Sequence, residues 1–217
     1  MNTQTYKNLN NKSTRTDNRF LIIKIGFFFV CLSLTSLACK KSENPAKQIY
    51  FQVSDSLLAP CYTDKVFNFS FCPPKDCYEV PKQAFDEAKA KLDLQSYSEE
   101  LINFELIRFF TDTTSNIFCT VTQILSSDLN KPDFSDIYLS ILRNKIPAGR
   151  VIKATYLINT LPVVQYLIMT DSTVNFKIVF QTRDQSTLQI DYAIARSIYS
   201  EYVKRIESSI GTIMVSL

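Results

Sequence analysis

The chain has 217 residues, of which 46% are hydrophobic and 21% are charged, with three glycines and neither histidine nor tryptophan. Without histidine there is no imidazole-centred catalytic triad and no histidine-ligated zinc or haem, and three widely separated glycines cannot form a phosphate-binding loop. The net charge of +3 comes from residues 1–38; the remaining 19 basic and 20 acidic residues give no indication of nucleic-acid binding.

Residues 1–38 have the layout of an export signal. A basic stretch ending at Arg19 precedes an apolar-leaning run of 13 residues, Ile25 to Leu37, and small residues follow before Cys39. The run suits the central region of a signal peptide and is shorter than the roughly 20 residues that span a bilayer. We therefore expect an exported protein.

The junction Ser36-Leu37-Ala38-Cys39 resembles a bacterial lipobox, in which small residues precede a cysteine that is acylated before cleavage. Ala38 and Cys39 match the two most restrictive positions, whereas Ser36 stands in the usual place of a leucine. We expect cleavage between Ala38 and Cys39 and a lipid anchor on Cys39 that holds the chain permanently at a membrane. Lys40 favours the outer over the inner membrane, with the periplasmic or surface face left open. The alternatives are an ordinary signal peptide with an incidental cysteine, or an uncleaved anchor.

Four cysteines remain when those of the signal and the lipid anchor are set aside. An even number in an exported protein permits two disulfides. The proline-containing loop between Cys72 and Cys77 predicts one bond, which would leave Cys61 and Cys119 as the second pair. A buried free Cys119 is the alternative. Because no two cysteines are separated by two residues, we expect neither redox catalysis nor metal binding.

Residues 39–49 predict a flexible polar tether, and residues 50–217 predict a single globular domain. Its first strand shows a clear alternation, with Phe67, Phe69 and Phe71 on one face. The turn Asp112–Ser115 predicts a hairpin between two later strands. The expected strands are Val66–Phe71, Phe104–Thr111, Asn116–Leu125, Val151–Asn159, Val163–Thr170 and Val174–Phe180.

Three helices are expected between and after these strands. The first begins at Pro81, and the second follows Asp133 with apolar residues at helical spacing. The third carries an apolar stripe that predicts a core-facing surface. Strands and helices in this order indicate an α+β fold, an antiparallel β-sheet with helices packed on it. The helices are expected over residues 81–92, 134–142 and 195–210.

Two segments resemble the PsbP/DcrB-like superfamily. Residues 67–74 are similar to its opening aromatic strand and proline-marked loop, and residues 199–213 are similar to its closing helix and tail. The tryptophan common after the first loop is replaced here by Cys77-Tyr78. The resemblance implies an α/β/α sandwich and an accessory or binding role. Relatives include an extrinsic photosystem subunit, a nuclear import factor that binds Ran, and a bacterial envelope lipoprotein, and no binding residue of theirs can be matched here.

Candidate catalytic residues are few. Asp171, Asp184 and Asp191 fall at turns or strand ends, and Asp191 is expected to cap the last helix. The stretch Asp112–Asn116 offers too few carboxylates for a calcium site. We therefore predict no catalytic residue, metal or cofactor, and a non-enzymatic binding or assembly module of the cell envelope with a protein or an apolar ligand as its partner. The alternative is a carboxylate-dependent envelope hydrolase.

Overall fold

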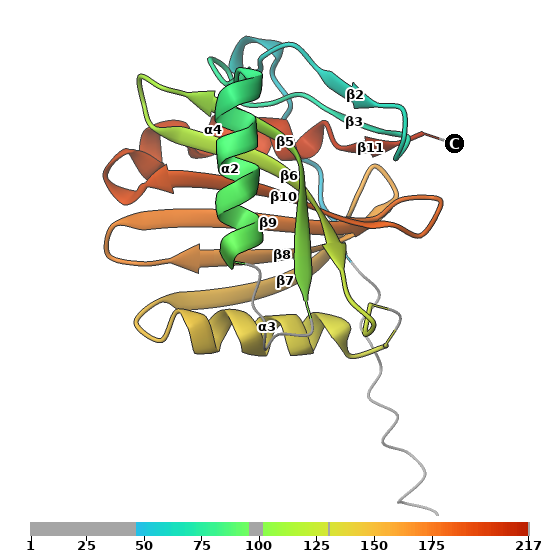
Figure 1. The fold of residues 1–217 in the computed structure, drawn as a ribbon. Helices are drawn as coiled ribbons and strands as arrows, with labels where there is room; N and C mark the ends of the chain where they lie inside the picture. The colour runs from blue at the N-terminus through green and yellow to red at the C-terminus, as the bar shows by residue number, and fades with distance from the viewer. Residues whose placement is uncertain (1–46, 96–101, 130, 217) are drawn as a thin grey trace, which may run out of the picture. The chain divides into compact units, whose positions relative to one another are not determined.

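An eight-stranded sheet lies at the centre of the computed structural model, which describes residues 47–95, 102–129 and 131–216 (Figure 1). The strand order is β1-β7-β8-β9-β10-β6-β5-β4, and every neighbouring pair is antiparallel except β1 and β7. The strands are β1 Lys47–Gln48, β4 Tyr78–Glu79, β5 Asn103–Asp112, β6 Ile117–Leu125, β7 Arg150–Ile158, β8 Leu161–Met169, β9 Thr173–Gln181 and β10 Thr187–Ala195.

The helices and a second, small sheet complete the described part of the chain. The small sheet has the order β11-β3-β2, with β2 Tyr62–Asp64, β3 Phe69–Phe71 and β11 Met214–Val215. The helical segments are η1 Asp55–Leu57, α2 Lys82–Gln95, α3 Phe134–Lys145, η2 Arg196–Ile198 and α4 Tyr199–Gly211. The expected signal peptide, Ala38, Cys39 and the first part of the tether lie outside the described residues.

One face of the large sheet packs against α4, which lies behind the sheet in Figure 1. Tyr202, Ile206 and Ile210 recur at helical spacing and are buried against it. Burying each large apolar side chain stabilises the fold by about 1.5–3 kcal/mol. The apolar stripe predicted for the last helix is therefore a core surface, as expected.

The opposite face packs against α3. Phe134, Tyr138 and Leu142 follow one another at intervals of four residues and are buried together with Tyr166 and Ile168 of β8. The amphipathic pattern that predicted this helix is confirmed. The two helices thus cover opposite faces of one mostly antiparallel sheet. The structure therefore agrees with the expected α+β class, in which helices pack on an antiparallel sheet.

Strand β10 is missing from the expected strands, although its sequence alternates. Leu188, Ile190, Tyr192 and Ile194 are buried on the α4 face, and the residues between them face the other side. Because these four residues pack under α4, the strand continues to Ala195 and the helix begins only after η2. The prediction that Asp191 caps the last helix is wrong, since Asp191 lies in the middle of β10.

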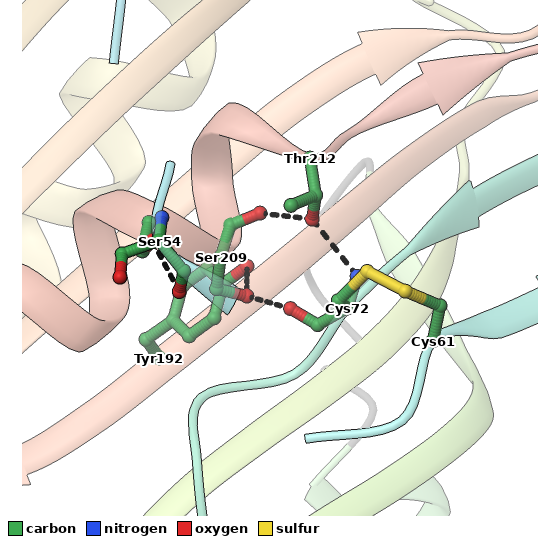
Figure 2. Close-up of a disulfide and its surroundings, with 7 residues drawn as sticks. Ser54, Cys61, Cys72, Tyr192, Ser209 and Thr212 are labelled. Carbon is green, nitrogen blue, oxygen red and sulfur yellow. Dashed lines mark hydrogen bonds between the residues drawn. A yellow bond between two sulfur atoms is a disulfide. The ribbon is translucent and has the colours of Figure 1, made fainter. Parts of the chain in front are cut away.

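The predicted bond between Cys72 and Cys77 is also wrong, and so is the pairing of Cys61 with Cys119. Cys61 is bonded to Cys72 (Figure 2), while Cys77 and Cys119 are buried and have no disulfide partner among the described residues. The register of the small sheet explains the choice. Tyr62 of β2 lies opposite Phe71 of β3. Cys61, which directly precedes β2, is therefore beside Cys72, which directly follows β3.

The same region ties the end of α4 to both sheets (Figure 2). The Ser209 hydroxyl donates to the carbonyl oxygen of Cys72 at 2.6 Å and lies 2.9 Å from the Tyr192 hydroxyl on β10. The Cys72 N–H donates to the Thr212 hydroxyl at 2.8 Å. These buried polar groups are therefore satisfied, and the disulfide has a structural setting.

Candidate functional site

A groove of about 680 Å³ opens on the face of the large sheet that carries α2 and α3. Helix α2 contacts β5 and helix α3 contacts β7, and β6, β10, β9 and β8 lie between these two strands in the sheet. The side chains that β6 and β10 turn to this face include three short ones, those of Thr120, Thr122 and Ala193. Short side chains between two helices leave the floor of the groove open, and the volume lies within the range of small-molecule sites.

The walls of the groove are mostly apolar, with Lys145 of α3 as a charged lining residue. On the β5 side they include Phe104, Leu106 and Phe109, and on the α3 side they include Ile141 and Leu142. The Phe118 ring of β6 also lines the groove, is 42% exposed and lies 6.0 Å from the Phe109 ring, measured between ring centroids. An exposed aromatic cluster in a concave site is typical of a surface that binds an apolar group.

A polar row crosses the floor of the groove. Thr120 of β6, Asp191 of β10 and Lys177 of β9 are direct cross-strand neighbours on one face. The Lys177 ammonium nitrogen donates to both carboxylate oxygens of Asp191, at 3.0 and 3.1 Å. Both side chains are only about one-fifth exposed. The pair is therefore partly desolvated, and its two opposite charges balance within the groove.

Gln189 and Tyr138 extend this row toward α3. The Gln189 amide nitrogen donates to Asp191 Oδ2 at 2.9 Å, and the Tyr138 hydroxyl donates to Gln189 Oε1 at 2.7 Å. Both Tyr138 and Gln189 are almost fully buried. The chain of hydrogen bonds fixes the Asp191 carboxylate from one side while Lys177 holds it from the other.

The other candidate carboxylates lie elsewhere. Asp171 is exposed in the turn between β8 and β9, and Asp184 lies in the turn between β9 and β10, where a hydrogen bond from Thr182 lowers its pKa. Asp112 accepts hydrogen bonds from the N–H groups of Thr114 and Ser115 and so closes the β5–β6 turn. Among the described residues lining the groove, Asp191 is the one carboxylate.

The two free thiols are unsuited to nucleophilic chemistry. Burial raises the pKa of Cys77 from 9 to about 12, and it raises the pKa of Cys119 well above 9. A thiol reacts as the thiolate, so both groups are inert at neutral pH. Within the described ranges, no cluster of three or more cysteine and carboxylate side chains is arranged to hold a metal ion.

A smaller cleft of about 430 Å³ lies near the start of α3, between Phe134 and the β8 and β9 strands. Thr187 lines it and is 4% exposed, and its hydroxyl group has no hydrogen-bond partner among the described residues. In the described part of the chain no helix is both long and apolar enough to cross a membrane.

Asp191 was predicted to cap a helix and not to lie in a groove. The missing signal was the alternation in β10, which puts Gln189 and Asp191 on the face opposite the buried residues. Lys177 was included in a predicted strand without a role. Thr120 could not be placed beside Asp191, because β6 and β10 are far apart in the sequence and only the sheet order brings them together.

Comparison with known proteins leaves the family open. No protein-family model matches the sequence, and no curated protein matches it. Among solved structures, the chain is similar to the solution structure of cyanobacterial PsbP from Synechocystis sp. PCC 6803. The TM-score is 0.47 and the identity 11%, over 74% of this chain and 94% of that chain. The likeness concerns the course of the chain alone and assigns no residue of the groove.

Proposed function

We propose that this protein is a non-enzymatic binding module and that its groove holds the apolar part of a small amphipathic molecule. One observation carries the proposal: an open groove whose walls are mostly apolar and which leaves the Phe118 ring 42% exposed. An apolar chain laid against Phe109 and Phe118 would remove this surface from water, which stabilises the complex by about 25 cal/mol for each Å² buried.

We further propose that the module works in the bacterial cell envelope, anchored through acylated Cys39 at the outer membrane. The support is the signal-like segment 1–38 and the lipobox-like junction in the sequence. The Cys61–Cys72 disulfide agrees with export to an oxidising compartment. We also propose that the fold is the α/β/α sandwich of PsbP-like proteins, supported by the packing of α3 and α4 on opposite faces of the sheet.

The proposal is tested by filling the groove. Ala193 lies on its floor beside Phe118, and an Ala193→Trp substitution puts a large ring where the ligand would lie. Ala154→Trp is the matched control, because Ala154 also belongs to a strand, is exposed and does not line the groove. A fluorescent probe with an alkyl chain is titrated into the purified full chain and both variants, and thermal unfolding verifies that both variants are folded.

We expect Ala193→Trp to weaken probe binding at least about tenfold, or about 1.4 kcal/mol, and Ala154→Trp to leave it unchanged. The comparison within one full chain cancels any binding by residues outside the groove. Equal binding by both variants, or no binding by the unaltered chain, would overturn the proposal.

A further inference from the structure

We propose that the ligand carries an uncharged, oxygen-bearing head group, such as a hydroxyl, ester or amide, which Lys177 and Thr120 bind on the floor of the groove. This inference rests on the proposed function, because it specifies the chemistry of a molecule that the groove is proposed to hold. It follows from three features: a donor left over on Lys177, a hydroxyl left over on Thr120, and the balance of charge around them.

Lys177 supplies the first donor. An ammonium group has three N–H donors. Two of the contacts of Lys177 go to the oxygens of Asp191, and in the described part of the chain its nitrogen makes no other hydrogen bond. One N–H is therefore available to an acceptor in the groove, which Lys177 lines. Asp191 holds the ammonium group in place, so little side-chain freedom is lost when a ligand binds.

Thr120 supplies the second contact. It lies beside Asp191 across the β6–β10 pair and lines the same groove. Thr120 is half-buried, and among the described residues its hydroxyl makes no hydrogen bond. Its cross-strand neighbour on the other side is Phe109, and Phe118 lies two positions earlier on the same face. A head group at this row would thus place an attached apolar chain directly against the two rings.

The balance of charge selects an uncharged head group. Lys177 and Asp191 already neutralise each other, and both are only about one-fifth exposed. Lys145 of α3 is the third charged residue that lines the groove, and it is exposed to solvent, so its charge is largely screened by water. A carboxylate ligand would add a second negative charge beside Asp191, and the two carboxylates would share Lys177. An ammonium ligand would add a second positive charge beside Lys177, and the two ammonium groups would share Asp191. A hydroxyl or carbonyl oxygen accepts the spare N–H without adding a charge, so it avoids the cost of an unpaired, partly desolvated ion.

The test uses three ligands of equal chain length, decanol, decanoate and decylammonium, each displacing the alkyl probe from the full chain at neutral pH and low ionic strength. We expect decanol to bind most tightly to the unaltered chain, by about tenfold over each ion. Asp191→Asn leaves Lys177 without its counter-ion, so decanoate should become the preferred ligand. Lys177→Met leaves Asp191 unpaired, so the preference should move to decylammonium. Both substitutions are close in size to the original side chain.

The outcomes separate this inference from the proposed function. If the probe binds and Ala193→Trp removes it, but decanoate or decylammonium is preferred by the unaltered chain, the inference is overturned and the groove remains a binding site. An order of preference that neither Asp191→Asn nor Lys177→Met changes overturns it as well. If no ligand displaces the probe and Ala193→Trp binds it normally, the proposed function fails. If Lys177→Met does not fold, the change of ligand preference in Asp191→Asn alone tests the inference.

Discussion

Lys177 on β9 and Asp191 on β10 are directly paired across the strands, with the ammonium nitrogen 3.0 and 3.1 Å from the two carboxylate oxygens. They stand 14 positions apart, one on each arm of a hairpin, and lie on a sheet face that two helices flank but do not cover. The register of the β9–β10 hairpin thus places the Lys177–Asp191 ion pair on the floor of the groove.

Removing both members of this pair should cost less than the sum of the costs of removing each one alone. Lys177→Met leaves a partly buried Asp191 without its counter-ion, and we expect the free energy of unfolding to fall by about 1–2 kcal/mol. The double variant with Asp191→Asn should lose less than the two single losses added together, by at least about 0.5 kcal/mol. Urea unfolding measures all three. Lys89→Met, in an exposed pair with Glu105 at 3.5 Å, is the control and should change stability by less than about 0.5 kcal/mol.

Two buried threonines on either side of the β9–β10 turn should respond in opposite ways to replacement by valine. In the part of the chain that the structure describes, the Thr187 hydroxyl has no hydrogen-bond partner, so Thr187→Val should raise the free energy of unfolding by about 1 kcal/mol. The Thr182 hydroxyl donates to the Ser186 carbonyl oxygen at 3.1 Å and to Asp184, so Thr182→Val should lower it by about 1–2 kcal/mol. Thermal and urea unfolding check both signs; a loss of stability in Thr187→Val would show that its hydroxyl is satisfied.

The local elements could be predicted from sequence because their signals are local. The β5–β6 hairpin follows from the Asp112 turn, and α3 follows from the spacing of Phe134, Tyr138 and Leu142. The groove could not be predicted, because it depends on which strands are neighbours. β10 pairs with both β9 and β6, and only this order sets Thr120 beside Asp191.

The disulfide partners also depend on which strands pair with each other. Cys72 and Cys77 are closer in sequence than Cys61 and Cys72, yet Cys77 leads into β4, which pairs with β5 in the large sheet. The pairing of Tyr62 with Phe71 in the small sheet decides the bond instead. Proximity along the chain is therefore a weaker guide to disulfide partners than strand register.

Peptide mapping without reduction should recover Cys61 linked to Cys72. Cys77 and Cys119 are almost fully buried, so they should be alkylated only after the chain is unfolded. A double variant, Cys61→Ser with Cys72→Ser, should lower the free energy of unfolding by about 3 kcal/mol, because the bond restricts the unfolded chain. A peptide linking Cys72 to Cys77, or labelling of Cys61 in the folded and unreduced protein, would contradict the structure.

The proposed lipid anchor requires that the Cys39 sulfur atom is acylated. Cys39→Ala should abolish incorporation of a labelled fatty acid and leave an uncleaved precursor, because the acylated cysteine is the site of processing. Cys31→Ala is the control, since Cys31 lies within the expected signal and should be dispensable for labelling. Label retained in the Cys39→Ala protein would show that the lipobox assignment is wrong, and fractionation of the two membranes tests the expected outer-membrane location.

Stability should decline in alkaline solution because of the buried thiols. Burial raises the pKa of Cys77 from 9 to about 12, so its contribution is complete below pH 9 and is lost as the pH rises toward 12. The unfolded chain releases this proton first, and the free energy of unfolding should fall by about 1.4 kcal/mol per pH unit for each such thiol. Cys77→Ala should reduce this slope by the share of one thiol, while tyrosine ionisation contributes equally to both proteins. Urea unfolding at a series of pH values measures the two slopes, and equal slopes would mean that Cys77 ionises freely in the folded protein.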